Sequence, residues 1–477
     1  MDTLLKNAPF LEYLQANIVE ANGREHNCCM FLSFHADARQ VRDFVTANFL
    51  DDNLKITTAL DCLKRNDRDY RKQRQHARTH AYSDARIPQE TQPIICFHLT
   101  YKGLEKLQIP DLATQFEPHT FFKASMQDRY TEDARANWDS VYTADTIDAM
   151  VFLASDDLEK IESLKSILEE RVNSTYSELC SIVQVEHGQH QYDDEGYVRE
   201  AFGFRDGLSK IQLWENGQLD TKYLCDSFLK KEDTEGRSYG SFFVFQKYHQ
   251  KVAVFQQKIK ALASDLGISE AYAEAQVVGR FKDGTPLLLS DEARAADATF
   301  NAQLKAFDRD KIDYTADEHG AKCPFHSHAR KMNPRDERFI KGSIAYKTNP
   351  DDKFLIHLLR RGIGYDYGEA DKGLLFMSYQ ASIRSQFWQV LNWAENPVEP
   401  GYSAHTGDDP LLAEQPTDKQ YAWNTEWGNP GAKTRKTHLF SDVVCLKGGV
   451  FFYTPSTLFL EQLRMPVSSE KEEHMTM

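Results

Sequence analysis

The sequence predicts an α+β fold made of two units that share one order of strands and helices. Short apolar runs typical of buried strands alternate with longer stretches whose apolar residues recur at helical spacing. In the first half of the chain the expected elements are a strand at 29–34, a helix at 36–49, a strand at 94–100, a helix at 101–107, a strand at 150–154, a helix at 156–172 and a strand at 182–186. Strand, helix and strand occurring twice in succession is typical of a ferredoxin-like unit, in which helices cover an antiparallel sheet.

The second half of the chain returns to a similar pattern without a strict repeat of the sequence. Its expected elements are a strand at 241–245, a helix at 250–266, a strand at 374–379, a helix through Trp388 and Val390, a strand at 450–453 and a helix at 456–463. We therefore predict two ferredoxin-like domains, at residues 1–212 and 213–477, each an antiparallel sheet with peripheral helices.

The composition is that of an ordinary globular protein with an acidic balance of charge. The 477 residues are 41% hydrophobic and 27% charged, and the formal net charge is −15. Nucleic acids and anionic membranes bind basic faces, so this charge argues against both as partners. The sequence also has no run that approaches the ~20 apolar residues needed to span a bilayer.

The N-terminal segment and the cysteines favour a reducing compartment. Residues 1–9 lack the charged-then-apolar pattern of a signal peptide. The eight cysteines are scattered along the chain, and four of them lie in apolar runs. Reduced thiols are therefore expected. We predict a cytoplasmic protein, and the sequence leaves a homo-oligomer open.

Residues 323–335 combine several side chains that can bind a metal or an anion. Cys323, His326 and His328 could ligate a transition metal or haem iron. The cations that follow, which could meet carboxylates or phosphates, are Arg330, Lys331 and Arg335. A structural zinc site would need a fourth ligand, and the sequence contains no CxxC pair. From these residues alone, haem ligation, zinc ligation and a structural role all remain open.

Two further stretches place charged residues beside glycine. Residues 203–207 have Asp206 between two glycines, in a bend that could present its carboxylate to a ligand or serve structure alone. The Asp-Gly pair within 279–286 is interpreted as a turn. Arg360 and Arg361 follow an apolar run, and adjacent strand residues point to opposite faces. One of them therefore faces inward and needs either a structural carboxylate or a bound oxyanion.

In their order along the chain, these blocks resemble the dye-decolourising (DyP-type) peroxidase family of haem enzymes, in its larger, intracellular-type subgroup. Gly203-Phe-Arg-Asp-Gly207 looks like the GxxDG signature of that family. The other blocks that resemble family segments, in the same order, are 15–24, 240–248, 278–286, 323–335, 360–363 and 373–382. The resemblance runs from about residue 15 to about residue 460.

The resemblance implies one haem b (heme b) per chain, in a cavity associated mainly with the C-terminal domain. His328, which matches the family's His-x-Arg-Lys, would be the proximal ligand of the iron, whereas His326 occupies a position that is not the usual ligand. Asp206 would be the distal acid–base residue and Arg360 the distal arginine. The other implied contacts are Leu374 and Phe376 as walls of the distal pocket, Arg330 beside a haem propionate, and Asp409 as the acid that orients His328.

The implied activity is reduction of hydrogen peroxide with one-electron oxidation of organic substrates such as dyes and phenolics. Because an aspartate base has an ordinary pKa near 4, we expect activity to peak at about pH 3.5–5.5. A bulky dye cannot reach a buried haem, so a surface tyrosine or tryptophan radical could oxidise it instead. The candidates near the distal block are Tyr379, Trp388 and Trp393.

Other functions remain open beside this one. A haem-binding carrier or sensor on the same fold would need neither Asp206 nor Arg360, and a zinc-dependent hydrolase would use the ligands of residues 323–335. Two stretches also depart from the family pattern. Gly364 stands in a loop where the family often has Pro-Tyr-Gly. The charged segment 63–87 matches no block, and is either a solvated surface excursion or a patch for an anionic partner.

Overall fold

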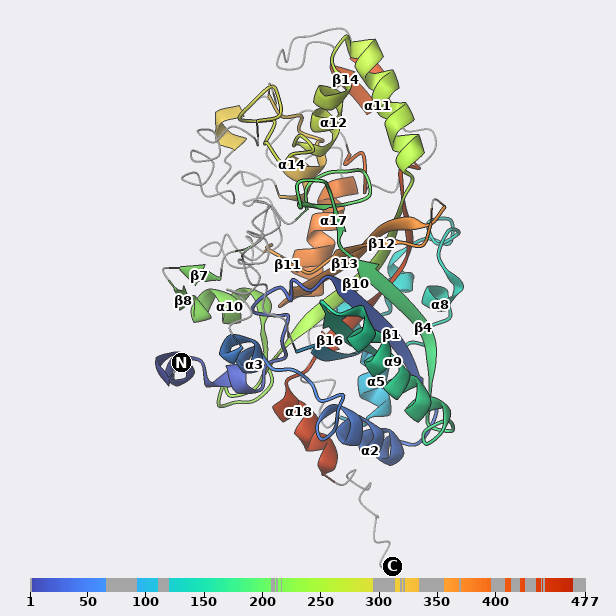
Figure 1. The fold of residues 1–477 in the computed structure, drawn as a ribbon, viewed down its shortest axis with the longest axis vertical. Coiled ribbons are helices and arrows are strands. Elements are labelled where there is room, and N and C mark those ends of the chain that lie inside the picture. Colours follow the sequence, from blue (N-terminus) through green and yellow to red (C-terminus); the bar gives the residue numbers. More distant parts are fainter. Residues whose placement is uncertain are drawn as a thin grey trace, which may run out of the picture.

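The structure is a computed structural model, and its elements form one body around a large sheet (Figure 1). The residues that it describes are 2–65, 92–109, 120–206, 211, 213–215, 217–294, 314–317, 320, 322–333, 356–368, 370–395, 408–412, 421–424, 435–438, 440 and 442–465. Nearly all of the charged segment 63–87 lies outside these residues.

The strands of the first unit have the order expected for a ferredoxin-like fold. They are β1 (His26–Phe34), β2 (Ile94–Leu99), β3 (Ala149–Ser155) and β4 (Cys180–Gln189), and their order in the sheet is β2-β3-β1-β4. All pairs are antiparallel. The first strand in the chain is therefore central, next to the third and the fourth.

The second unit has the same order of strands. They are β10 (Tyr239–Gln250), β12 (Ile363–Asp366), β13 (Lys372–Gln380) and β16 (Val444–Thr454), with the short β11 (Leu359–Arg360) also beside β13. Their order is β12-β13-β10-β16, so the first strand again lies between the third and the fourth. The prediction of an α+β fold with two ferredoxin-like units is confirmed.

The two units share a single sheet that curls until its ends approach each other. Tyr453 of β16 pairs with Leu99 of β2, which joins the units in one ten-stranded sheet. At the other seam, β4 lies against β12. A Cβ added to Gly188 of β4 would lie 2.3 Å from Ile363 Cγ2 of β12. The boundary that we place after residue 212 stays a prediction, because that residue lies outside the described ones.

Alternate residues from both units meet in the space that the curled sheet encloses. Phe31 of β1 lies 5.0 Å from Phe245 of β10, measured between ring centroids. His98 of β2 stacks on Phe243 of β10 at 4.4 Å, and burial lowers the pKa of His98 to about 3. This imidazole is therefore neutral at ordinary pH. Because aromatic residues of both halves fill one interior, neither unit completes its core alone.

Helices cover the outer face of the first half, whereas the long helix of the second unit lies away from the sheet and packs against a neighbouring helix (Figure 1). α2 (Ala38–Phe49) begins where Asp37 accepts hydrogen bonds from the backbone N–H groups of its first turn, and Phe49 at its end stacks on Phe97 of β2 at 4.5 Å. α9 (Leu158–Asn173) is capped in the same way by Asp157. In the second unit, α11 (Val252–Leu266) ends at Gly267, whose φ of 66° suits glycine.

The remaining elements are short. The helices are α1 (Asp2–Asn7), α3 (Ala59–Lys64), α5 (Tyr101–Lys106), α7 (Thr120–Lys123), α8 (Ser140–Thr143), α10 (Thr221–Phe228), α12 (Glu270–Val278), α14 (His328–Met332), α17 (Trp388–Glu395) and α18 (Thr457–Glu461), with single turns at Pro9–Glu12, Met126–Arg129, Tyr314–Asp317, Ile383–Phe387 and Gln462–Arg464. The strands are β5 (Gln191–Tyr192), β6 (Val198–Arg199), β7 (Trp214–Glu215), β8 (Gln218–Leu219), β9 (Lys230–Lys231), β14 (Tyr421–Asn424) and β15 (Arg435–His438).

Every strand and helix expected from the sequence is present. The strands are longer than their apolar runs indicate, because backbone pairing continues into polar residues. In β10 it continues from Phe245 through Gln246 and Lys247 to Gln250. Among the described helices, none combines the length and the apolar character that crossing a bilayer requires.

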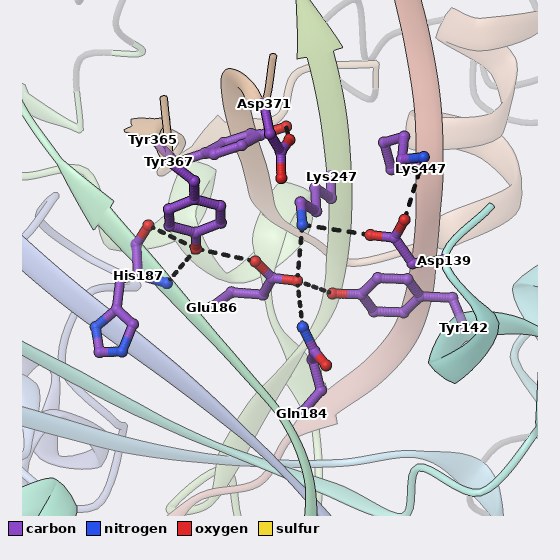
Figure 2. Close-up of polar contacts among 10 residues, drawn as sticks. All are labelled: Asp139, Tyr142, Gln184, Glu186, His187, Lys247, Tyr365, Tyr367, Asp371 and Lys447. Carbon is purple, nitrogen blue, oxygen red and sulfur yellow. Dashed lines mark hydrogen bonds and ion pairs between the residues drawn. The ribbon is translucent and has the colours of Figure 1, made fainter. Parts of the chain in front are cut away.

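A buried polar cluster lies where β4 of the first unit meets the second (Figure 2). Its centre is the carboxylate of Glu186, which is fully buried. One oxygen accepts hydrogen bonds from the Tyr142 hydroxyl at 3.1 Å and the Gln184 amide at 2.9 Å. The other accepts from the Tyr367 hydroxyl at 3.0 Å. The cluster thus joins β4 to the segment that follows β12.

Lys247 of β10 supplies the positive charge of this cluster. Its Nζ lies 3.2 Å from Glu186 Oε1 and 3.3 Å from Asp139 Oδ2. Burial alone would lower the pKa of Lys247, but the two carboxylates outweigh burial and raise it. The ammonium group is therefore charged, and the buried charges are paired, as burial requires.

We expect Lys247→Met to destabilise the protein strongly. Removing one partner of a buried ion pair leaves the other uncompensated, which costs about 3–5 kcal/mol. Chemical denaturation, compared with the wild type, measures the loss. The control is Lys222→Met, which removes a highly exposed partner of Asp226 and should change stability by less than ~1 kcal/mol. Equal stability of both variants would contradict a structural role for the Glu186–Lys247 pair.

Candidate active site

His328 and Asp409 form the centre of the site. His328 is the first residue of α14, and its Nδ1 lies 2.8 Å from Asp409 Oδ2. The carboxylate of Asp409 is fully buried, whereas the His328 side chain is about one-third exposed. A carboxylate accepts hydrogen bonds, so the imidazole donates from Nδ1 and its lone pair lies on Nε2. Nε2 is therefore the nitrogen that can bind a metal ion.

The chain around Asp409 holds its carboxylate in place. Oδ1 accepts hydrogen bonds from the backbone N–H groups of Leu411 at 2.8 Å and Leu412 at 3.1 Å. The N–H of Asp409 donates to the carbonyl of Ala394 in α17 at 2.7 Å. Both carboxylate oxygens of Asp409 therefore accept hydrogen bonds from the protein itself. The contact between Asp409 and His328, which the family resemblance implies, is present.

A turn between α12 and the next segment touches both α14 and the loop that carries Asp206. A Cβ on Gly279 would lie 3.0 Å from Ala329 Cβ, so the turn packs closely on α14. Three residues on, the carbonyl of Lys282 accepts the N–H of Arg205 at 2.9 Å. The turn expected at 279–286 is confirmed by a bridge between its two ends. It brings the His328 helix and the Asp206 loop into one region.

The Asp206 loop is anchored by aromatic residues and leaves Asp206 exposed. Phe202 stacks on Phe255 of α11 at 4.2 Å, and Phe204 belongs to the same buried cluster. Leu411 packs against that cluster too. The N–H of Asp206 donates to the carbonyl of Val198 at 2.9 Å, and its side chain is exposed. The apolar cluster therefore fixes the Asp206 loop and the Asp409 segment together.

The outer face of β13 carries the other predicted residues. Leu374 and Phe376 are half-buried, while Leu375 and Met377, which alternate with them, point inward and are buried. Arg360 of β11 pairs with Ser378 of β13 and is exposed. Paired residues of antiparallel strands share a face, so Arg360 lies on the same face as Leu374 and Phe376. Three residues predicted for the distal side thus lie along one surface.

The neighbouring arginine has a structural role. Arg361 donates to the backbone carbonyls of Asn17 and Ile18 at 2.6 and 2.7 Å. Adjacent arginines therefore do point apart, as expected, and the inward partner is a pair of carbonyls, not a carboxylate. The family's Pro-Tyr-Gly loop is replaced by β12, in which Gly364 pairs with Leu374.

Arg330 differs from its predicted role beside a haem propionate. Its guanidinium is almost completely buried and donates to Asp317 Oδ2 at 2.9 Å and to the Cys323 carbonyl at 2.7 Å. It also lies against the rings of Tyr314 and Phe325. Arg330 is committed to the segment before α14, because burial requires a guanidinium to be paired with an anion. The contact of Arg330 with a haem propionate stays a prediction.

The other two candidate metal ligands of this stretch do not join His328. Burial raises the pKa of Cys323 to about 11, so its thiol stays protonated. His326 is buried. Within the described residues, no group of three or more His, Cys, Asp and Glu side chains could hold a metal ion. The zinc alternative finds no support in this geometry.

The three candidate radical sites are unequal in their access to solvent. Tyr379 is fully buried and Trp393 is 3% exposed, so neither can touch a bulky substrate directly. Trp388 is half-buried and packs against Phe121 and Tyr130. Of the three, only Trp388 therefore reaches solvent.

A family model and two curated relatives agree in what this chain is similar to. Residues 198–400 match the family model described as "Dyp-type peroxidase, C-terminal". The chain is 27% identical to the "Multifunctional dye peroxidase DyP2" of Amycolatopsis sp., covering 96% of each protein. It is 26% identical to "Peroxidase 2" of Mycetinis scorodonius, covering 77% of this chain and 76% of that protein.

Solved structures agree with these sequence matches. The crystal structure of a DyP-type peroxidase from Anabaena sp. superposes with a TM-score of 0.72 at 26% identity, covering 96% of this chain and 95% of that one. The structure of DyP2 from Amycolatopsis sp. gives a TM-score of 0.70 at 25% identity, covering 95% of this chain and 96% of that one. The region matched by the family model contains His328, Asp206 and Arg360.

Proposed function

Because this chain belongs to the dye-decolourising (DyP-type) peroxidase family and is a peroxidase, we propose that it reduces hydrogen peroxide and oxidises organic substrates by one-electron steps, with His328, Asp206 and Arg360 as the central residues. Dyes and phenolics are the substrate class that the family implies. The contact that carries the proposal is the hydrogen bond from His328 Nδ1 to the buried Asp409, at 2.8 Å. It orients a single half-exposed imidazole for metal ligation.

The residues present fit haem b better than an isolated metal ion. A haem needs one protein ligand on its iron and an apolar surround. His328 supplies one nitrogen, whereas a protein zinc site needs three or four ligands. Leu374 and Phe376, half-buried on the outer face of β13, are suited to an apolar contact. When bound, haem would supply an iron centre that gives up two electrons to peroxide and then regains them, one at a time, from organic substrates.

Asp206 is proposed to move a proton between the two oxygens of hydrogen peroxide. Breaking the O–O bond unevenly requires one oxygen to lose a proton and the other to gain one. A carboxylate that lies within reach of both, directly or through one water, can serve each step in turn. Asp206 is an exposed acid on a loop fixed by Val198 and the aromatic cluster. Its place on a fixed loop supports this role.

Arg360 and Asp409 are proposed to supply the charges that the reaction needs. Arg360 carries a permanent positive charge on the face of Leu374 and Phe376, where it can stabilise the anionic oxygens that develop from peroxide. Asp409 accepts the Nδ1 proton of His328 and so makes Nε2 a more basic donor. Both residues act by electrostatics, and neither has to give up a proton.

We expect His328→Ala to lose its haem. The purified wild type should show a strong Soret band that responds to added peroxide, and the variant should not, because the iron has lost its protein ligand. The control is His326→Ala, two residues away, which should keep the Soret band. Unchanged haem binding in His328→Ala would rule out this ligand. A Soret band in the wild type without any turnover would instead favour a haem carrier.

We expect Asp409→Asn to keep haem but weaken the site. The amide is a poorer acceptor for the Nδ1 proton, so His328 becomes a weaker donor. Substitution of such a partner typically costs 10- to 100-fold in metal affinity or activity. Haem affinity and the reduction potential of the iron measure the change, and the potential should rise. A potential equal to that of the wild type would show that Asp409 does not act through His328.

We expect activity toward dyes to peak at acidic pH. A free carboxyl group can act as a base at lower pH than a free imidazole can, because its ordinary pKa is lower. Asp206→Asn should lower the rate of reaction with peroxide by about 10²- to 10⁴-fold, the usual contribution of a general acid–base residue. A profile that peaks well above neutral in the wild type would count against Asp206.

A further inference from the structure

The segment between β6 and Asp206 folds around the side chain of Glu200. Its Oε1 accepts the N–H of Phe204 at 2.8 Å, and its Oε2 accepts the N–H of Phe202 at 3.1 Å. The backbone of Glu200 pairs with the same loop, since its carbonyl accepts the N–H of Gly203 at 2.8 Å. Gly203 has a φ of 92°, which glycine adopts without strain. One carboxylate therefore holds both sides of a tight loop.

A hydrogen bond from a residue of β10 connects this loop to the strand that pairs with β13. The amide of Gln250, the last residue of β10, donates to Glu200 Oε2. Gln250 is 8% exposed, so this contact is shielded from solvent. Successive side chains of a strand alternate between faces, so Gln250 shares its face of β10 with Tyr248. Tyr248 in turn pairs with Leu374 of β13.

Glu200 thus connects two parts of the proposed site that are distant in sequence. On one side it shapes the loop that ends at Asp206, and on the other it is bonded to the strand beside β13. The apolar contacts of Phe202 and Phe204 hold the loop against α11, but such contacts are not directional. The hydrogen bonds of Glu200 set the path of the backbone between those two rings.

The charge of Asp206 also reaches the Glu200 carboxyl. Burial raises the pKa of Glu200, and the negative charge of Asp206 adds to the rise, while the hydrogen bonds from Phe204, Gln250 and Phe202 oppose it. The proposal rests on the geometry of the loop, and this effect agrees with it.

We propose that Glu200 is a positioning residue, which together with Gln250 holds Asp206 at the place where it can transfer a proton to and from peroxide. This inference rests on the proposed role of Asp206. Displacing a catalytic group by about 1 Å can lower the reaction rate 10²-fold. The hydrogen bonds that fix the Asp206 loop are therefore expected to affect the rate of the reaction with peroxide. Glu200 itself does not touch the reacting atoms in this proposal.

The variants that test it are Glu200→Gln, Glu200→Ala and Gln250→Leu. The matched control is Glu195→Gln, which removes the same charge from an exposed residue five positions earlier. The first readout is amide hydrogen exchange in a peptide covering residues 198–206, measured on the protein without haem. Exchange should be faster in the Glu200 variants than in the wild type or the control, because the N–H groups of Phe202 and Phe204 lose acceptors.

The second readout is kinetic. The Glu200 variants and Gln250→Leu should lose on the order of 10- to 100-fold in kcat/KM for hydrogen peroxide, while KM for the reducing dye stays unchanged. In an Asp206→Asn background, Glu200→Gln should cause no further loss, because it acts through Asp206. If Glu200→Ala does not fold, the milder Glu200→Gln and the Gln250→Leu variant, which leaves Glu200 intact, give the same test.

The outcomes separate this inference from the proposed function. If Asp206→Asn alone has no effect on the reaction with peroxide, the role of Asp206 fails, and this inference fails with it. If Asp206→Asn is slow but Glu200→Gln and Gln250→Leu stay within twofold of the wild type, only the positioning role of Glu200 is overturned. A full additional loss in the double variant would also overturn it, since Glu200 would then act independently of Asp206.

Discussion

The closure of one sheet shared by two units is the constraint on which the rest of the structure depends. At one seam the units meet through the pair Tyr453 and Leu99, and at the other β4 lies against β12. The buried Glu186–Lys247 pair crosses that second seam. Because the enclosed interior is filled by residues of both halves, the outer face of β13 has a fixed position. Of the residues proposed for the distal side, Arg360, Leu374 and Phe376 lie on that face.

Carboxylates that are buried or half-buried organise the irregular segments around this face. Asp409 accepts the N–H groups of Leu411 and Leu412 and orients His328. Asp317 accepts the N–H of Cys323 at 2.9 Å and pairs with Arg330, and Glu200 shapes the Asp206 loop. A carboxylate that accepts several N–H groups stabilises a chain path that has no helix or strand to hold it.

The sequence predicted the order of elements well because that order depends on local patterns. Apolar residues at 41, 44, 45 and 49 have helical spacing, and they form one buried face of α2. His328 could be separated from His326 only through the family resemblance, since both are histidines in one short stretch. The burial of His326 and the half-exposure of His328 agree with that separation. The ion pair between Arg330 and Asp317 could not be predicted, because no pattern in the sequence marks Asp317 as an acid that will be buried.

The sequence by itself predicted the fold class and the two units, whereas the imidazole and the distal residues that we propose were named only through the family resemblance. These predictions were possible because the spacing of apolar residues and the short motifs each involve residues that lie close together in the sequence. Only the tertiary structure decided that the units share one sheet, that Arg361 binds carbonyls, and that Glu200 and Gln250 meet. These contacts join residues that are distant along the chain, and their partners are ordinary polar residues. Their roles follow from where the folded chain places them, and burial then makes each hydrogen bond costly to lose.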